Sequence, residues 1–136
     1  MSLTNGHGSV TNADGSTSFV YLRTPTAGLA TSAGWSTLVP LECHYQGLDL
    51  FHTVLTLYGP AGNLLGSLDL RDVSAGAEAA IILNLTVHGS TVVVRWNNQD
   101  IGGGARHLVD VGVGSVDLTW TGSGFATASF YEREIQ

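Results

Sequence analysis

The fold class of this chain is decided by residues 83–96, LNLTVHGSTVVVRW. Two apolar, β-branched runs flank Gly89-Ser90, and glycine at the first position of a two-residue loop favours a tight hairpin turn. The expected cross-strand pairs are Val87 with Val92, Leu85 with Val94, and Leu83 with Trp96. All six side chains then share one side, and a slip of one residue would destroy this agreement. The segment predicts an antiparallel hairpin with one apolar face.

Two further glycine turns extend this pattern toward the C-terminus. Gly114-Ser115 predicts a second two-residue hairpin, and residues 122–124, Gly-Ser-Gly, predict a loop that brings the chain back. The expected pairs are Val113 with Val116, Val111 with Leu118, and Val109 with Trp120, followed by Trp120 with Ala126, Leu118 with Ala128, and Val116 with Phe130. Residues 108–131 are therefore expected to form a three-stranded meander.

A turn at residues 59–62, Gly-Pro-Ala-Gly, joins a strand over 51–58 to a strand over 64–70. This pair of strands is apolar on both faces. One face carries Leu55, Leu57 and Leu65, and the other carries Val54, Tyr58, Leu64 and Leu68. Because both faces then need a cover, we expect one to pack on the core and the other on a neighbouring subunit. The candidate interface residues are Leu55, Leu57 and Leu65, or Val54 and Leu68 if the two faces are reversed.

Two earlier strands, over residues 18–23 and 36–45, bring the expected number to about nine, with residues 24–34 as a long loop between them. Residues 1–16 are rich in Gly, Ser, Thr and Asn, which predicts a flexible N-terminal arm. Short strands punctuated by turns are typical of a β-sandwich. We expect an all-β fold, a single antiparallel sandwich over residues 17–136 with jelly-roll or similar Greek-key order.

The composition argues against several classes of partner. Hydrophobic residues make up 43% of the chain and charged residues 12%, which leaves little charge to cover a free surface. The net charge of −6, with arginine as the only strongly basic residue type, makes nucleic acid and anionic membranes unexpected partners. Cys43 is the single cysteine, so no disulfide forms within the chain. The N-terminal stretch also lacks the charged and apolar regions of a signal peptide.

The chain has one dense group of possible metal ligands, namely Glu42, Cys43, His44, Asp49 and His52. Their spacing matches none of the standard zinc patterns. In a strand, Cys43 shares an apolar face with Val39 and Leu41, which we expect to be core, while Glu42 and His44 point the other way, where we expect solvent. We expect a structural role for these residues, and neither a metal nor a cofactor.

Catalytic motifs are not evident in the sequence. No serine lies in a G-x-S-x-G turn. Residues 102–107, Gly-Gly-Gly-Ala-Arg-His, offer backbone amides that can cradle an anion, but the lysine of a phosphate-binding loop is missing. A flexible connection is the simpler interpretation of this loop. We therefore expect no catalytic residues.

Carbohydrate binding is the alternative that the aromatic residues leave open. Sugar sites use exposed rings beside polar side chains, and residues 96–100, Trp-Asn-Asn-Gln-Asp, have that composition. The expected register turns Trp96 and Trp120 inward, so Trp35 is the tryptophan left free to be exposed. The candidate ligand residues under this alternative are Trp35, Asn97, Asn98 and Asp100.

Taken together, these features favour a non-enzymatic assembly module that packs against copies of itself or a larger protein assembly. The specific expectation is a virion protein, such as a decoration (cement) protein on a phage capsid lattice. Low charge, a strand pair that is apolar on both faces and a polar arm support it. A carbohydrate-binding module or lectin, cytoplasmic or released without a signal, is the alternative, and a small β-barrel enzyme comes third.

Overall fold

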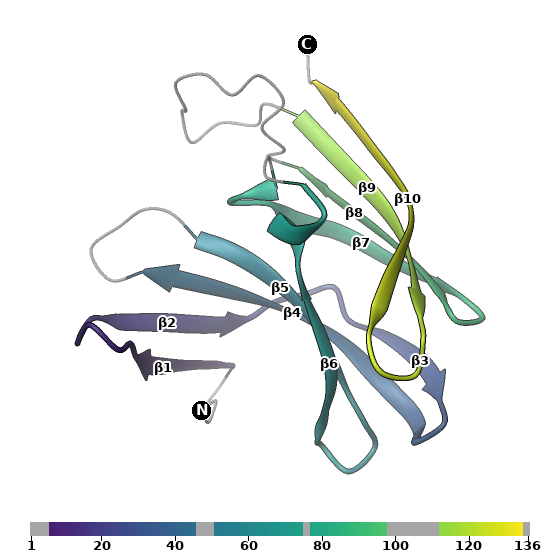
Figure 1. The fold of residues 1–136 in the computed structure, drawn as a ribbon, viewed down its shortest axis with the longest axis horizontal. Helices are drawn as coiled ribbons and strands as arrows, with labels where there is room; N and C mark the ends of the chain where they lie inside the picture. The colour runs from purple at the N-terminus through teal and green to yellow at the C-terminus, as the bar shows by residue number, and fades with distance from the viewer. Residues whose placement is uncertain (1–5, 46–50, 75–76, 98–111, 135–136) are drawn as a thin grey trace.

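The computed structural model describes residues 6–45, 51–74, 77–97 and 112–134. These residues form ten strands in two antiparallel sheets, joined by one short 3-10 helix, η1 (Leu70–Asp72) (Figure 1). The all-β prediction is therefore confirmed. Over these ranges, no helix is long and apolar enough to cross a membrane.

Sheet A contains the six N-terminal strands. They are β1 (His7–Thr11), β2 (Thr17–Leu22), β3 (Ala27–Thr31), β4 (Gly34–Tyr45), β5 (Phe51–Tyr58) and β6 (Leu64–Asp69). The neighbours run in the order β1-β2-β4-β5-β6, and β3 also pairs with β4. Because β4 is twelve residues long, β2 and β3 pair with different halves of the same edge of this strand.

Sheet B contains four strands, β7 (Ile81–His88), β8 (Thr91–Asn97), β9 (Gly112–Trp120) and β10 (Phe125–Glu134). Their order is β10-β9-β8-β7, so neighbouring strands follow the order of the chain. Apart from β3, the same holds in sheet A, and η1 leads from β6 of one sheet toward β7 of the other (Figure 1). The expected jelly-roll or Greek-key order is not seen in these sheets, which are two consecutive meanders.

The main core lies between the two sheets. Sheet A contributes Leu29, Leu38, Leu55 and Leu57, and sheet B contributes Val92, Val94, Trp96, Val116 and Leu118. Every one of these side chains is at most 1% exposed. Burial of each large apolar side chain stabilises the fold by roughly 1.5–3 kcal/mol before entropic costs. This shared core holds the two sheets together.

The hairpin over residues 83–96 is confirmed at its turn and at two of its three pairs. Gly89 has φ of +63°, and the pairs Val87–Val92 and Leu85–Val94 form as expected. A β-bulge between Ile82 and Asn84 then shifts the register, so that Ile82 and not Leu83 pairs with Trp96. As a result Ile82 is buried, while Leu83 is 51% exposed.

The predicted turn at Gly114-Ser115 is wrong. Both residues lie inside β9, which continues without interruption and pairs with β8 along its length. A Cβ atom on Gly114 would lie 2.4 Å from Cε2 of Trp96, so this glycine makes room for the indole ring. The three-stranded meander that forms is β8-β9-β10, and residues 108–111 lie outside the described part of the chain.

The loop over residues 122–124 is confirmed, with Gly122 at φ of +99°. Val116 pairs with Phe130 as expected, but Leu118 pairs with Thr127. Likewise Trp120 pairs with Phe125, because a bulge between Thr127 and Ser129 shifts the register closer to the turn. Such a bulge adds one residue to one strand, which the sequence pattern does not reveal.

Two segments expected to be irregular form strands. β1 lies within the expected arm and pairs with β2, while β3 lies within the expected long loop over residues 24–34. The β1–β2 turn is held by the Asn12 amide, which donates to the Ser16 carbonyl at 2.8 Å, and by Asp14, whose carboxylate accepts from the Ser16 backbone amide. The described strands therefore begin before residue 17 and number ten, not nine.

Candidate functional site

Sheet A has an apolar outer face in addition to the face that forms the core. Residues paired directly across antiparallel strands point to the same side of a sheet, and side chains alternate along each strand. Leu22 pairs with Leu41, and Leu41 pairs with Val54. The same register and alternation extend this surface, the outer face of sheet A, to Val10, Val20, Trp35, Val39, Cys43, Tyr58 and Leu64.

A small second cluster forms the centre of this face. Val20, Val39 and Leu41 are buried there, with Cys43 and Tyr58 packed against them. The flanking side chains are open to solvent: Val10, Leu22, Leu64 and Trp35 are 39%, 40%, 56% and 68% exposed. An antiparallel sheet with one face on a core usually shows polar residues on the other. The outer face of sheet A departs from this pattern, because its centre and its flanks are apolar.

Trp35 is exposed, as the sequence predicted, and it has the highest exposure among the large apolar side chains of this face. Its indole ring lies against β3, because a Cβ atom on Gly28 would lie 2.1 Å from Cζ2 of Trp35. One side of the ring is therefore supported by the backbone of the neighbouring strand, and the other side is free. Trp96 is fully buried, and Trp120 packs partly buried against the core.

The three leucines predicted for the interface belong to the core side of sheet A. Leu55 and Leu57 are fully buried between the sheets, and Leu65 packs partly buried against the same core. The sequence shows that β5 is apolar on both faces, but it does not show which face meets sheet B. The outward face is the opposite one, which carries Val54, Tyr58 and Leu64. Leu68, which the sequence predicts on that face, pairs with Leu55 and packs against the core.

The possible metal ligands are divided between the two faces of sheet A. Glu42 and His44 lie on the core side, and Cys43 and His52 lie on the outer face. Asp49 and residues 102–107 lie outside the described ranges. In the part of the chain that the structure describes, no group of three or more His, Cys, Asp and Glu side chains is placed to hold a metal ion.

Glu42 and His44 do not point into solvent as expected but take part in a cluster on the core side of sheet A. The Glu42 carboxylate accepts from His44 Nε2 at 3.1 Å and pairs with Arg23 Nε at 3.2 Å. The His44 ring stacks on Phe51 and meets Tyr21 edge-on, with both centroid distances at 5.0 Å. Both polar contacts of this cluster use one carboxylate oxygen, Glu42 Oε1, which links Arg23 and His44.

A second charged group lies at the end of β6. Arg71 donates from Nη2 to Asp69 Oδ2 at 2.7 Å and from Nε to Oδ1 at 3.1 Å, while His52 Nε2 lies 3.8 Å from Oδ2. Burial alone would raise the pKa of Asp69, but hydrogen bonds from Arg71 hold it below its ordinary value. Burial and the charge of Arg71 lower the pKa of His52.

Cys43 belongs to the same neighbourhood. Burial, and next the negative charge of Asp69, raise the pKa of the Cys43 thiol above its ordinary value. Because the thiolate is the nucleophilic form, this environment disfavours reaction. Cys43 therefore acts as a small apolar residue beside Val39 and Leu41, as predicted, but this face is the outer face of sheet A and not the core between the sheets.

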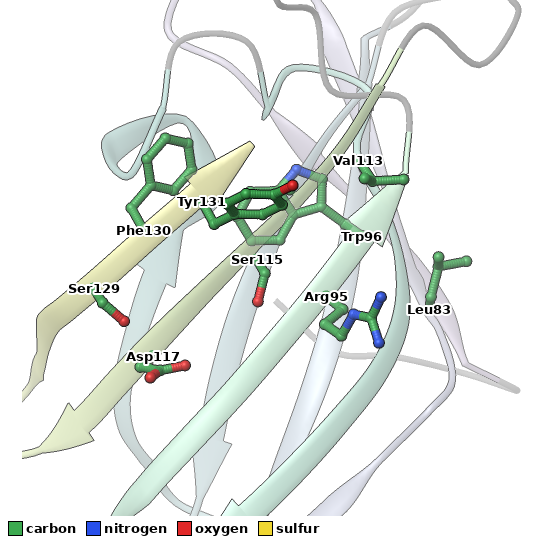
Figure 2. A pocket seen from close by; sticks show the side chains of 10 residues that line it. Leu83, Arg95, Trp96, Val113, Ser115, Asp117, Ser129, Phe130 and Tyr131 are labelled. Carbon is green, nitrogen blue, oxygen red and sulfur yellow. The ribbon is translucent and has the colours of Figure 1, made fainter. Parts of the chain in front are cut away.

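The outer face of sheet B is polar, and it contains a groove. The groove has a volume of about 430 Å³ and runs across all four strands of the sheet (Figure 2). The side chains that matter for its chemistry are Leu83, Arg95, Ser115, Asp117, Ser129 and Tyr131. No sequence motif marks this groove, because its residues come from four strands spread over almost fifty positions of the chain.

The carbohydrate alternative requires Trp35 and Asn97 to lie in one site, and the structure does not bring them together. Trp35 lies in sheet A beside the β3–β4 turn, while Asn97 ends β8 in sheet B. Figure 1 shows these two places at opposite ends of the molecule. Asn98 and Asp100 lie outside the described residues. Among known proteins, no family model, no curated protein and no solved structure matches this chain.

Proposed function

We propose that this chain is a non-enzymatic assembly module that binds through the outer face of sheet A. The observation that carries this proposal is the second apolar cluster around Leu41, on the side of the sheet that faces away from the core. Leu22, Trp35 and Leu64 extend that cluster with side chains exposed to water. Removing such surface from water stabilises a complex by about 25 cal/mol per Å².

The shape of this surface supports a protein as the partner. Small molecules bind in concave pockets, whereas the outer face of sheet A is an extended sheet surface that matches another extended surface. The two candidates are a second copy of the chain and the lattice of a larger assembly. A molecule with one apolar outer face and one polar outer face suits attachment to a lattice, since the polar face remains in water.

A virion is the setting that we propose for this assembly, with a decoration protein of a phage capsid as the specific case. Its support is the composition, with charged residues at only 12% of the chain and arginine in place of lysine throughout, together with the small two-sheet fold. The distinguishing measurement is binding to phage particles that lack this chain, followed by sedimentation of the particles.

The assembly surface itself can be tested with a matched pair of variants. Leu22 on the outer face of sheet A and Ile81 on sheet B are both 40% exposed, so aspartate at either position costs the folded monomer a similar amount. We expect the wild-type chain to sediment as a dimer or larger species at micromolar concentration, or to bind the particles. L22D should abolish this association, and I81D should preserve it, with unchanged circular dichroism for both.

The proposal fails if the wild-type chain stays monomeric at high concentration and binds no particles. It also fails if L22D and I81D weaken association equally, because the effect would then come from added charge and not from the chosen face. The carbohydrate alternative on Trp35 and Asn97 is not proposed in that form, since the two residues lie on different sheets.

A further inference from the structure

We infer that the groove on the outer face of sheet B binds a neutral oligosaccharide. This inference goes beyond the proposed assembly function, because it uses the opposite side of the molecule and different residues. Its basis is the arrangement of an exposed aromatic ring, two opposite charges and two hydroxyls along one groove (Figure 2).

The strand register places these side chains in two adjacent rows. Tyr131 pairs with Ser115, and Ser115 pairs with Arg95, so these three side chains cross β10, β9 and β8 on one face. Ser129 pairs with Asp117 in the next row on the same face. Since neighbouring strands lie about 4.8 Å apart, the first row spans about 10 Å, which suits a disaccharide lying across the strands.

Apolar surface lies at both ends of the first row. Tyr131 is 58% exposed, and its ring extends from the edge strand over β9, above Ser115 (Figure 2). At the far side Leu83, pushed outward by the bulge in β7, is 51% exposed. A pyranose ring has apolar C–H faces that pack on an aromatic ring, so Tyr131 offers a stacking surface.

The polar side chains between these ends are available to a ligand. Over the described residues, no hydrogen bond or ion pair occupies the side chains of Arg95, Ser115, Asp117 or Ser129. Arg95 donates, Asp117 accepts, and the two serine hydroxyls do both. Sugar hydroxyls both donate and accept, so this mixed set matches them better than it matches a ligand with a single type of polar group.

The charges of the groove favour a neutral ligand. Arg95 and Asp117 carry opposite charges, so neither a polyanion nor a polycation gains from both. The volume of about 430 Å³ falls within the range of small-molecule sites, and the groove is open along the sheet, as a chain of sugars requires. These features together point to a neutral oligosaccharide and against an ionic polymer.

The test uses the full chain on an array of immobilised neutral and acidic oligosaccharides. The neutral oligosaccharide with the strongest signal is then titrated in soluble form by calorimetry, so that assembly and avidity do not affect the result. We expect saturable binding with one site per chain. Y131A and R95Q should each weaken it at least about tenfold, a loss of about 1.4 kcal/mol.

Matched controls come from sheet A. F19A removes another partly exposed aromatic ring, and R23Q removes another partly exposed arginine, neither of them in the groove. Both should bind the saccharide like the wild type. When the saccharide is titrated into the protein, NMR chemical shifts should change for residues of β9 and β10 and stay unchanged for residues of β4.

The inference is overturned if no neutral glycan on the array binds. It is equally overturned if only acidic glycans bind, or if W35A abolishes binding while Y131A retains it. None of these results bears on assembly through the outer face of sheet A, because L22D and I81D test that face separately.

Discussion

The two sheets use their core faces alike and their outer faces differently. Both contribute leucine, valine or isoleucine to the shared core. Outside, sheet A presents a second apolar cluster around Leu41, whereas sheet B presents Thr, Ser, Asp and Arg side chains that alternate with core residues. This alternation is typical of a sheet with one solvated face. It fails in sheet A, on the face that we propose for assembly.

The tryptophans repeat this contrast on a smaller scale. Each ring lies against a strand glycine, namely Trp35 on Gly28, Trp96 on Gly114, and Trp120 on Gly66. Trp96 is enclosed by the core and cannot move away, while Trp35 is 68% exposed and can turn into solvent. The same tryptophan–glycine contact should therefore contribute more to stability in the core than on the outer face of sheet A.

The largest expected effect compares these glycines. In G114A the new Cβ atom would lie 2.4 Å from the enclosed Trp96 ring, so we expect a loss of about 3 kcal/mol in the free energy of unfolding. In G28A the Trp35 ring can swing outward, and the expected loss is about 1 kcal/mol or less. Chemical denaturation of both variants measures the difference. Equal losses would show that the Trp35 ring is held as firmly as a core residue.

A medium effect compares two valines on the outer faces. Val39 belongs to the second cluster and is 7% exposed, whereas Val93 lies half-buried on the polar face of sheet B. V39A should lower the free energy of unfolding by about 1.5 kcal/mol, since each buried methyl group contributes roughly 0.8 kcal/mol. V93A should cost about half of that or less. A larger loss in V93A would mean that the two outer faces do not differ as described.

The smallest effect is a pH dependence that sheet A should show through Asp69 and His52. Both groups have a lowered pKa in the folded chain, so the unfolded chain binds protons more readily, and acid favours unfolding. The contribution of His52 to the free energy of unfolding should be lost as the pH falls below its ordinary pKa of 6.5. That of Asp69 should be lost as the pH falls below its ordinary pKa of 3.8. Melting temperatures of D69N and H52Q across this range should show a flatter acid limb than the wild type. An unchanged limb in both variants would contradict the assigned shifts.

Local sequence signals are sufficient to locate most strands and three of the turns. Gly89-Ser90, residues 59–62 and residues 122–124 each combine a turn residue with apolar runs on both sides, and all three form as predicted. The sequence also predicts that Trp35 is exposed and that Cys43 shares a face with Val39 and Leu41. Both predictions are possible because the alternation of side chains along a strand is a local property.

Three outcomes depend on contacts between distant residues, and the sequence does not contain them. The sequence predicts a turn at Gly114, yet this glycine lies in a strand, where it makes room for the Trp96 ring. The two cases look alike in sequence, because glycine is used both where φ is positive and where another group approaches the backbone closely. The bulge that exposes Leu83 cannot be predicted from the alternation of apolar and polar residues, because it interrupts that alternation. Which face of β5 becomes core is decided by the position of sheet B, and this decision moves Leu55 and Leu57 inside. Local sequence determines which residues of a strand share a face, but only the packing of one sheet on the other determines which face becomes the core.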